Sequence, residues 1–194
     1  MKKRYVFFKT ITTLLNPFIL FGPVQFILYL VLPEYNEPLL VFLNIILQSV
    51  LPFALIGAFI QFKLVSDFEI TKKSERPLYF SIVTIFFVLS GFISHAIPIL
   101  QLIAFALALC LISIILINLV WKISGHLAFD VILFAGLACV DRVFGLLFFL
   151  LPVVAWSRVV LRKHSWKQTL GGVLLGVVCF CVVWFLLGFD GVFP

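Results

Sequence analysis

The sequence has few charged residues. Only 11% of its 194 residues are Asp, Glu, Lys or Arg, whereas 64% are hydrophobic, and the mean hydropathy is +1.27. A soluble domain of this length carries more charge. The composition therefore excludes a soluble domain and indicates that a lipid bilayer surrounds most of the chain. The net charge is +6. Without a soluble basic face, this favours an anionic lipid surface or a phosphorylated substrate as partner, and we expect no nucleic acid.

Cysteines and metal-ligating clusters are also few. Each of the four cysteines lies in an apolar run without the spacing of a metal site. No carboxylate cluster has a suitable spacing either, so we expect no metal and no cofactor. We interpret the cysteines as small hydrophobic residues rather than as disulfides. They are Cys110, Cys139, Cys179 and Cys181.

Long apolar runs predict an all-α fold, a polytopic membrane helix bundle with about six or seven transmembrane helices and a single domain over residues 1–194. Asn44 and Gln48 are expected to face other helices. Gly172 and Gly176 form a G-x-x-x-G pair, which predicts close packing on another helix of the same chain. The runs cover about residues 11–32, 39–62, 79–94, 98–120, 127–156 and 169–187.

The run at 127–156 is too long for one straight span, and it contains Asp141 and Arg142 near its middle. A charged pair at the bilayer centre is unfavourable. We therefore predict a hairpin of two short helices that turns at these two residues. The hairpin brings the total to seven crossings and returns the chain to the side that it left.

Seven crossings place three polar segments on one side of the membrane: residues 63–77, 124–126 and 157–168. Residues four apart on a helix share a face. Lys72 and Arg76 would then suit a divalent anion, and Gln168 would hold one ring nitrogen of His164.

The middle segment reads Ser124-Gly125-His126. The glycine allows the backbone and the serine hydroxyl to approach a small anion, and His126 would start a helix, where anions are favoured. Asp130 follows His126 by four residues. It is either a partner for that histidine or a polar residue near the membrane interface.

In this order, the three segments resemble the type 2 phosphatidic acid phosphatase family, which is related in fold to vanadium haloperoxidases. The family signature is a lysine, six residues and Arg-Pro; then Pro-Ser-Gly-His; then Ser-Arg, five residues, His, three residues and Asp. Arg76-Pro77, Ser124-Gly125-His126, and Ser157-Arg158 followed by His164 match it. The resemblance covers about residues 63–180.

Three positions depart from the signature. Glu69 stands where the family has its lysine, although Lys72 or Lys73 would supply a cation from the next turn. Ile123 replaces the proline of the second part. Gln168 replaces the aspartate, and loss of that charge would lower the rate by up to ~10⁴-fold without compensation. The site is then slower, differently tuned or inactive.

The resemblance implies that His164 attacks phosphorus and forms a phosphohistidine, with Gln168 in the orienting position. His126 would protonate the leaving alcohol and then activate water. The substrate would have a phosphate head at the interface and an acyl or isoprenoid tail between helices. The implied phosphate-binding residues are Arg76, Arg158, Ser124, Gly125, Lys72 and Lys73.

Three other functions stay open. One is a catalytically weak or inactive relative that binds phospholipid headgroups, which Glu69 and Gln168 favour. A phosphotransferase would use the same residues with another acceptor than water. A small transporter is less favoured, because such proteins place ionisable residues at mid-membrane, whereas nearly all charge here falls at the predicted ends of spans.

In the seven-span arrangement, all lysines and arginines except Arg142 fall on the side of the three polar segments. The positive-inside rule then predicts a site that faces the cytoplasm, in the plasma or inner membrane.

Overall fold

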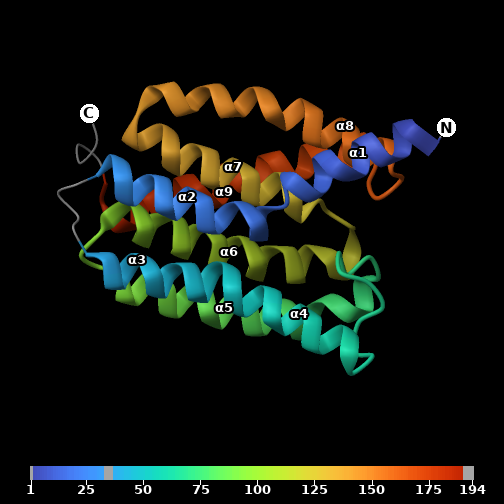
Figure 1. The fold of residues 1–194 in the computed structure, drawn as a ribbon, viewed down its shortest axis with the longest axis horizontal. Helices are drawn as coiled ribbons and strands as arrows, with labels where there is room; N and C mark the ends of the chain where they lie inside the picture. The colour runs from blue at the N-terminus through green and yellow to red at the C-terminus, as the bar shows by residue number, and fades with distance from the viewer. Residues whose placement is uncertain (1, 33–36, 190–194) are drawn as a thin grey trace.

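The computed structural model describes residues 2–32 and 37–189, and every regular element in these ranges is a helix. The long helices run roughly side by side along the longest dimension of the molecule (Figure 1). The predicted all-α fold is therefore confirmed. The helices are α1 (Lys2–Leu14), α2 (Pro17–Val31), α3 (Pro38–Ile45), α4 (Leu51–Gln61), α5 (Arg76–Ile93), α6 (Pro98–Val120), α7 (Gly125–Val140), α8 (Leu151–Val160) and α9 (Trp166–Leu187). A π-helical turn (Ile46–Val50) joins α3 to α4, and 3-10 segments precede α5 (Lys73–Glu75) and α8 (Arg142–Leu150).

Five helical segments in the described ranges are long and apolar enough to cross a bilayer, and α1 with α2, bent by 44°, would make a sixth. α7 is apolar but has 16 residues. At 1.5 Å per residue it spans about 24 Å, less than the ~30 Å hydrocarbon core. The protein is therefore an integral membrane protein with five or six long apolar helices, where the sequence predicts about six or seven. The five are Pro38–Gln61, Lys73–Ile93, Pro98–Val120, Arg142–Val160 and Trp166–Leu187.

The hairpin predicted within residues 127–156 is present. α7 ends at Val140, and Asp141 is extended, with φ −145° and ψ 127°. The Asp141 carboxylate accepts a hydrogen bond from the Val143 N–H at 2.8 Å and so caps the 3-10 segment before α8. α7 and α8 run in opposite directions (Figure 1). The chain thus returns to the end of the bundle at which α7 began.

The first apolar run is broken between α1 and α2. The Asn16 side chain accepts a hydrogen bond from the Phe18 N–H at 3.0 Å and caps α2. Pro17 occupies the first turn of α2, where its missing N–H removes no helical hydrogen bond. α1 packs against α8. A 2.7 Å hydrogen bond between the hydroxyls of Thr12 in α1 and Ser157 in α8 joins the two helices. The break therefore directs α1 toward the helix that carries the third polar segment.

A buried polar network joins α2, α3, α5 and the π-helical turn. Gln25 Nε2 donates to Gln48 Oε1 at 2.7 Å, and Gln48 Nε2 donates to Ser90 Oγ at 2.5 Å. Asn44 Oδ1 accepts hydrogen bonds from the Ser90 and Ser94 hydroxyls, the latter at 2.9 Å. All five side chains are almost fully buried. The prediction that Asn44 and Gln48 face other helices is confirmed.

The glycines of the G-x-x-x-G pair bring α9 close to the start of α7. A Cβ at Gly172 would collide with the Ser124 carbonyl, and one at Gly176 would collide with the Ala128 carbonyl. The predicted close packing within one chain is therefore confirmed. The close contact with α9 fixes the position of the start of α7.

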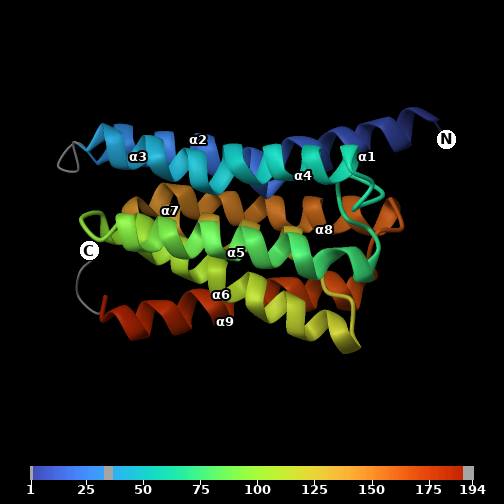
Figure 2. The same ribbon diagram turned by 90° about the horizontal axis from the view of Figure 1, so that it is seen from below.

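The three polar segments lie together at one end of the bundle, where α1 also begins (Figures 1 and 2). They are the connection from α4 to α5, the connection from α6 to α7, and the connection from α8 to α9. This juxtaposition follows from the α7–α8 hairpin, because one straight helix would have separated the second segment from the third.

Candidate functional site

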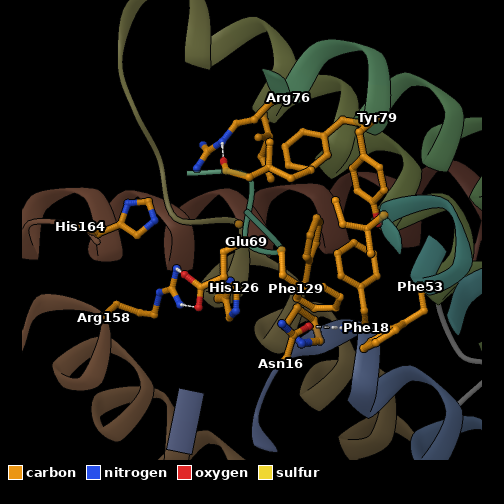
Figure 3. A pocket seen from close by; sticks show the side chains of 17 residues that line it. Asn16, Phe18, Phe53, Glu69, Arg76, Tyr79, His126, Phe129, Arg158 and His164 are labelled. Carbon is orange, nitrogen blue, oxygen red and sulfur yellow. Dashed lines mark hydrogen bonds and ion pairs between the residues drawn. The ribbon is translucent and has the colours of Figure 1, made fainter. Parts of the chain in front are cut away.

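One pocket takes residues from all three polar segments (Figure 3). Its polar end is lined by Arg76, Gly125, His126, Arg158 and His164, which are predicted site residues, together with Glu69. Aromatic side chains line most of the remainder, together with Asn16, Pro17 and three isoleucines; the aromatic residues are Phe18, Phe53, Phe68, Tyr79, Phe80 and Phe129. The pocket therefore combines an ionisable end with an apolar end.

Arg158 is the most deeply buried cation at the polar end. It lies in the last turn of α8 and is 3% exposed. Its two Nη groups donate to the two carboxylate oxygens of Glu69, at 3.2 and 3.3 Å. Its Nε has no hydrogen-bond partner among the described residues. The guanidinium thus forms a two-pronged ion pair with Glu69, and its Nε–H group remains able to donate to a ligand.

Glu69 is also held by Lys163, whose Nζ lies 3.1 Å from Glu69 Oε2 and 3.1 Å from Thr71 Oγ1. Partial burial by itself would raise the pKa of Glu69, but the ion pairs with Arg158 and Lys163 outweigh burial and hold that pKa below its usual range. The carboxylate is therefore ionised at neutral pH. Lys163, which sequence reasoning did not single out as a site residue, supplies the cation near Glu69.

The loop that carries Glu69 is fastened on both sides of it. Asp67 Oδ1 accepts hydrogen bonds from the Glu69 and Thr71 N–H groups, at 3.0 and 3.3 Å. Ile70 is buried with a left-handed backbone, φ 47°. Its carbonyl accepts a hydrogen bond from Arg76 Nε at 2.9 Å. The Glu69 side chain thus projects from a fixed backbone.

Arg76 lies at the start of α5 and is also buried. Besides Ile70, its guanidinium contacts Asn118, with Nη1 donating to Oδ1 at 3.3 Å. The same Asn118 oxygen accepts a hydrogen bond from the Ile123 N–H at 3.3 Å. Asn118 therefore ties the first polar segment to the second. No motif in the sequence indicated this role.

His164 lies in the turn between α8 and α9. The backbone N–H of His164 donates a hydrogen bond to the Arg158 carbonyl at 3.3 Å. Arg162, with a left-handed φ of 56°, lies within the same turn. Burial, followed by the positive charges of Arg158, Lys122 and Arg76, lowers the pKa of His164 to about 3. The imidazole is therefore neutral at physiological pH. A neutral imidazole has a lone pair for nucleophilic attack.

Gln168 does not take the geometry expected of it. The sequence argument placed His164 and Gln168 on one helix face, but α9 begins at Trp166. Gln168 Oε1 accepts a hydrogen bond from the Ser165 N–H at 3.0 Å, and Ser165 Oγ accepts one from the Gln168 N–H, so the pair caps α9. Within the described chain, His164 Nδ1 has no hydrogen-bond partner. The amide lies close enough to oppose the fall in the pKa of His164.

The start of α7 contributes Gly125 and His126 to the pocket, whereas Ser124, also predicted to bind phosphate, does not line it. Ser124 is fully buried, and its N–H bonds to the Gln168 carbonyl at 3.2 Å. In the part of the chain that the structure describes, neither Ser124 Oγ nor His126 Nε2 has a hydrogen-bond partner. The first N–H groups of a helix also lack partners within the helix. Several unpaired polar groups therefore meet at this end of the pocket, as in an oxyanion-binding site.

Lys72 and Lys73, the cations expected to replace the family lysine, lie outside the pocket. Both are exposed, and Lys72 Nζ pairs with Glu75 Oε1 at 3.1 Å. Lys72 also precedes α5, so it does not share a helix face with Arg76. The cation near Glu69 comes from Lys163 instead. Lys163 directly precedes His164, but nothing in the sequence indicated that its side chain points toward Glu69.

Asp130, for which two readings were open, is fully buried on α7. Neither of its carboxylate oxygens has a hydrogen-bond partner in the described ranges, so it does not hold the His126 ring. Nor does it lie at an exposed interface position. It is a buried carboxyl close enough to Arg158 to interact with its charge.

No family model matches the chain, and neither a curated protein nor a solved structure is similar to it.

Proposed function

We propose that the protein is a membrane-embedded lipid phosphatase, similar in its site to type 2 phosphatidic acid phosphatases. It would hydrolyse a phosphomonoester or diphosphate of a phosphatidic acid-like or isoprenyl lipid. The observation that carries the proposal is the meeting of two histidines and two arginines from three distant segments in one pocket. The aromatic remainder of that pocket suits an apolar chain next to the phosphate.

In this mechanism, a nitrogen of the neutral His164 imidazole attacks phosphorus. The bond from phosphorus to the alcohol oxygen breaks, and His126 would give that oxygen a proton. Burial and the Arg158 charge lower the pKa of His126, so this step requires that the bound phosphate anion offsets them and that His126 takes up a proton in the complex. His126 then takes a proton from water, whose oxygen attacks the phosphohistidine and releases inorganic phosphate and free His164. Phosphoryl transfer depends mainly on positioning and charge stabilisation, which Arg76, Arg158 and the start of α7 would supply.

A second candidate, a weakly active or inactive protein that binds phospholipid headgroups, is favoured by two contacts. Glu69 occupies both Nη groups of Arg158. Gln168, in the position of the family aspartate, is committed to the cap of α9. A pocket with these contacts can still bind an anionic headgroup without turning it over.

Phosphate release by the purified protein separates the two candidates. The panel is phosphatidic acid, phosphatidylglycerophosphate, and isoprenyl mono- and diphosphates. We expect release from at least one of them, and we expect His164→Ala to lower it by at least ~10³-fold, because the nucleophile is lost. The matched control is His95→Ala, which changes an exposed histidine in the turn between α5 and α6.

Full turnover by a folded His164→Ala protein would contradict the mechanism. Lipid binding without phosphate release from any member of the panel would support the second candidate. Release that requires an added alcohol acceptor would identify a phosphotransferase.

A further inference from the structure

The Glu69 carboxylate stands where an anionic ligand of Arg158 would bind. Both Nη groups of Arg158 donate to it, at 3.2 and 3.3 Å. The Arg158 side chain is only 4% exposed, whereas that of Glu69 is 24% exposed. Glu69 is therefore the more exposed partner of the ion pair, and its carboxylate faces the Arg158 guanidinium in the pocket (Figure 3).

Glu69 is held against Arg158 by its neighbours. Asp67 accepts a hydrogen bond from the Glu69 N–H, and Arg76 Nε donates to the carbonyl of the next residue, Ile70. Lys163 Nζ lies 3.1 Å from Glu69 Oε2. Because the backbone is fixed on both sides, the carboxylate can leave Arg158 by rotating its side chain while the loop stays in place.

The carboxylate satisfies only part of the site. In the described chain, three buried polar atoms of residues that line the same pocket have no hydrogen-bond partner: Arg158 Nε, His164 Nδ1 and His126 Nε2. Buried polar atoms are normally paired, and such a group without partners indicates a missing ligand or water. A tetrahedral oxyanion presents more oxygens than a carboxylate. It would satisfy more of these atoms than Glu69 does.

We infer that Glu69 is a built-in competitor of the ligand: its carboxylate occupies Arg158 in the resting protein, and a phosphate group binds there only after displacing it. The inference rests on the proposed function only in taking phosphate as the headgroup, and it requires no hydrolysis. Ligand affinity is reduced by the fraction of protein in which Glu69 covers Arg158. Substitution of Glu69 removes this competition.

The test is the dissociation constant of inorganic phosphate, measured by calorimetry on the full chain in detergent. We expect Glu69→Gln, which keeps the shape and removes the charge, to bind phosphate at least tenfold more tightly than the unmodified protein. Glu69→Ala is a second variant, in case the glutamine amide occupies Arg158. The matched control is Glu75→Gln, which removes the same charge from the same polar segment and should change the constant less than twofold.

A double-mutant cycle with Arg158→Gln separates local competition from general electrostatics. We expect the gain from Glu69→Gln to disappear when Arg158 is absent. An equal gain without Arg158, an equal gain in Glu75→Gln, or no tighter binding in either Glu69 variant would overturn the inference. Tighter phosphate binding by the Glu69 variants together with an absence of lipid hydrolysis would contradict the proposed phosphatase activity but support the inferred role of Glu69 as a competitor.

Discussion

His164 is uncharged at physiological pH because of where the chain places it. Burial and the cations of Arg158, Lys122 and Arg76 lower its pKa to about 3, whereas an unfolded histidine titrates near 6.5. The surroundings that suit a nucleophile therefore oppose protonation.

The depressed pKa makes folding stability dependent on pH. Between pH 6.5 and 3 the unfolded chain binds a proton at His164 that the folded protein does not, so acidification favours unfolding. Acidification from pH 6.5 to 4.5 should lower the free energy of unfolding by ~2 kcal/mol through this residue. Thermal unfolding of the unmodified protein and of His164→Gln at both values measures the difference. The Glu69 contribution lies in another window, because its pKa is below its usual 4.5, and its stabilisation is lost only below that pH.

A His164→Gln protein that loses as much stability as the unmodified chain between pH 6.5 and 4.5 would contradict this prediction. The comparison of unfolding free energies requires no measurement of enzymatic activity. It therefore tests the electrostatic environment of His164 independently of the reaction.

At the scale of helices, the site depends on how closely α9 approaches α7. A Cβ at Gly172 would collide with the Ser124 carbonyl, so Gly172→Ala must push the start of α7 away. We expect a loss of about 1–3 kcal/mol in stability, the usual effect of overpacking. We also expect phosphate release to fall at least tenfold, because Ser124 and His126 shift with α7. Thermal unfolding and phosphate release measure the two effects.

Gly57→Ala is the matched control for that substitution. Nothing lies within 4 Å of a Cβ at Gly57 in α4. Alanine stabilises a helix interior by roughly 0.5–1 kcal/mol relative to glycine, so this variant should be at least as stable as the original. Equal behaviour of the two variants would contradict the proposed role of the α7–α9 contact.

The apolar runs predicted the helices well, but contacts at their ends were predicted less well. The α7–α8 hairpin followed from one energetic argument, the unfavourable burial of Asp141 and Arg142, and it is present. The expectations that Lys72 shares a helix face with Arg76 and that Gln168 holds the His164 ring assumed helices that start earlier than α5 and α9 do. The contacts of Glu69 with Arg158 and Lys163 join the loop before α5 to the end of α8 and the turn after it, which are far apart in the sequence, and such contacts leave no local pattern.

For the molecule as a whole, charge is distributed unevenly between its two ends. Lys9, Lys63, Lys122 and Arg158 belong to the end that carries the pocket, whereas the α7–α8 turn carries Asp141 and Arg142. The positive-inside rule predicts that the pocket faces the cytoplasm.

This orientation can be measured by labelling introduced cysteines with a membrane-impermeant reagent in intact cells. The background lacks Cys181, the exposed native cysteine in the described chain. We expect Asp141→Cys to react at once and Lys72→Cys to react only after permeabilisation. The reverse pattern would place the pocket outside.

The buried polar network has a consequence for how the protein is made. Asn44 and Gln48 emerge from the ribosome well before Ser90, which accepts a hydrogen bond from Gln48, and Ser94, which donates one to Asn44. Amide groups left facing lipid are unfavourable, so the first helices gain their stable neighbours only when α5 arrives. The N-terminal third of the chain is therefore completed by a later segment, and its assembly in the membrane must wait for that segment's synthesis.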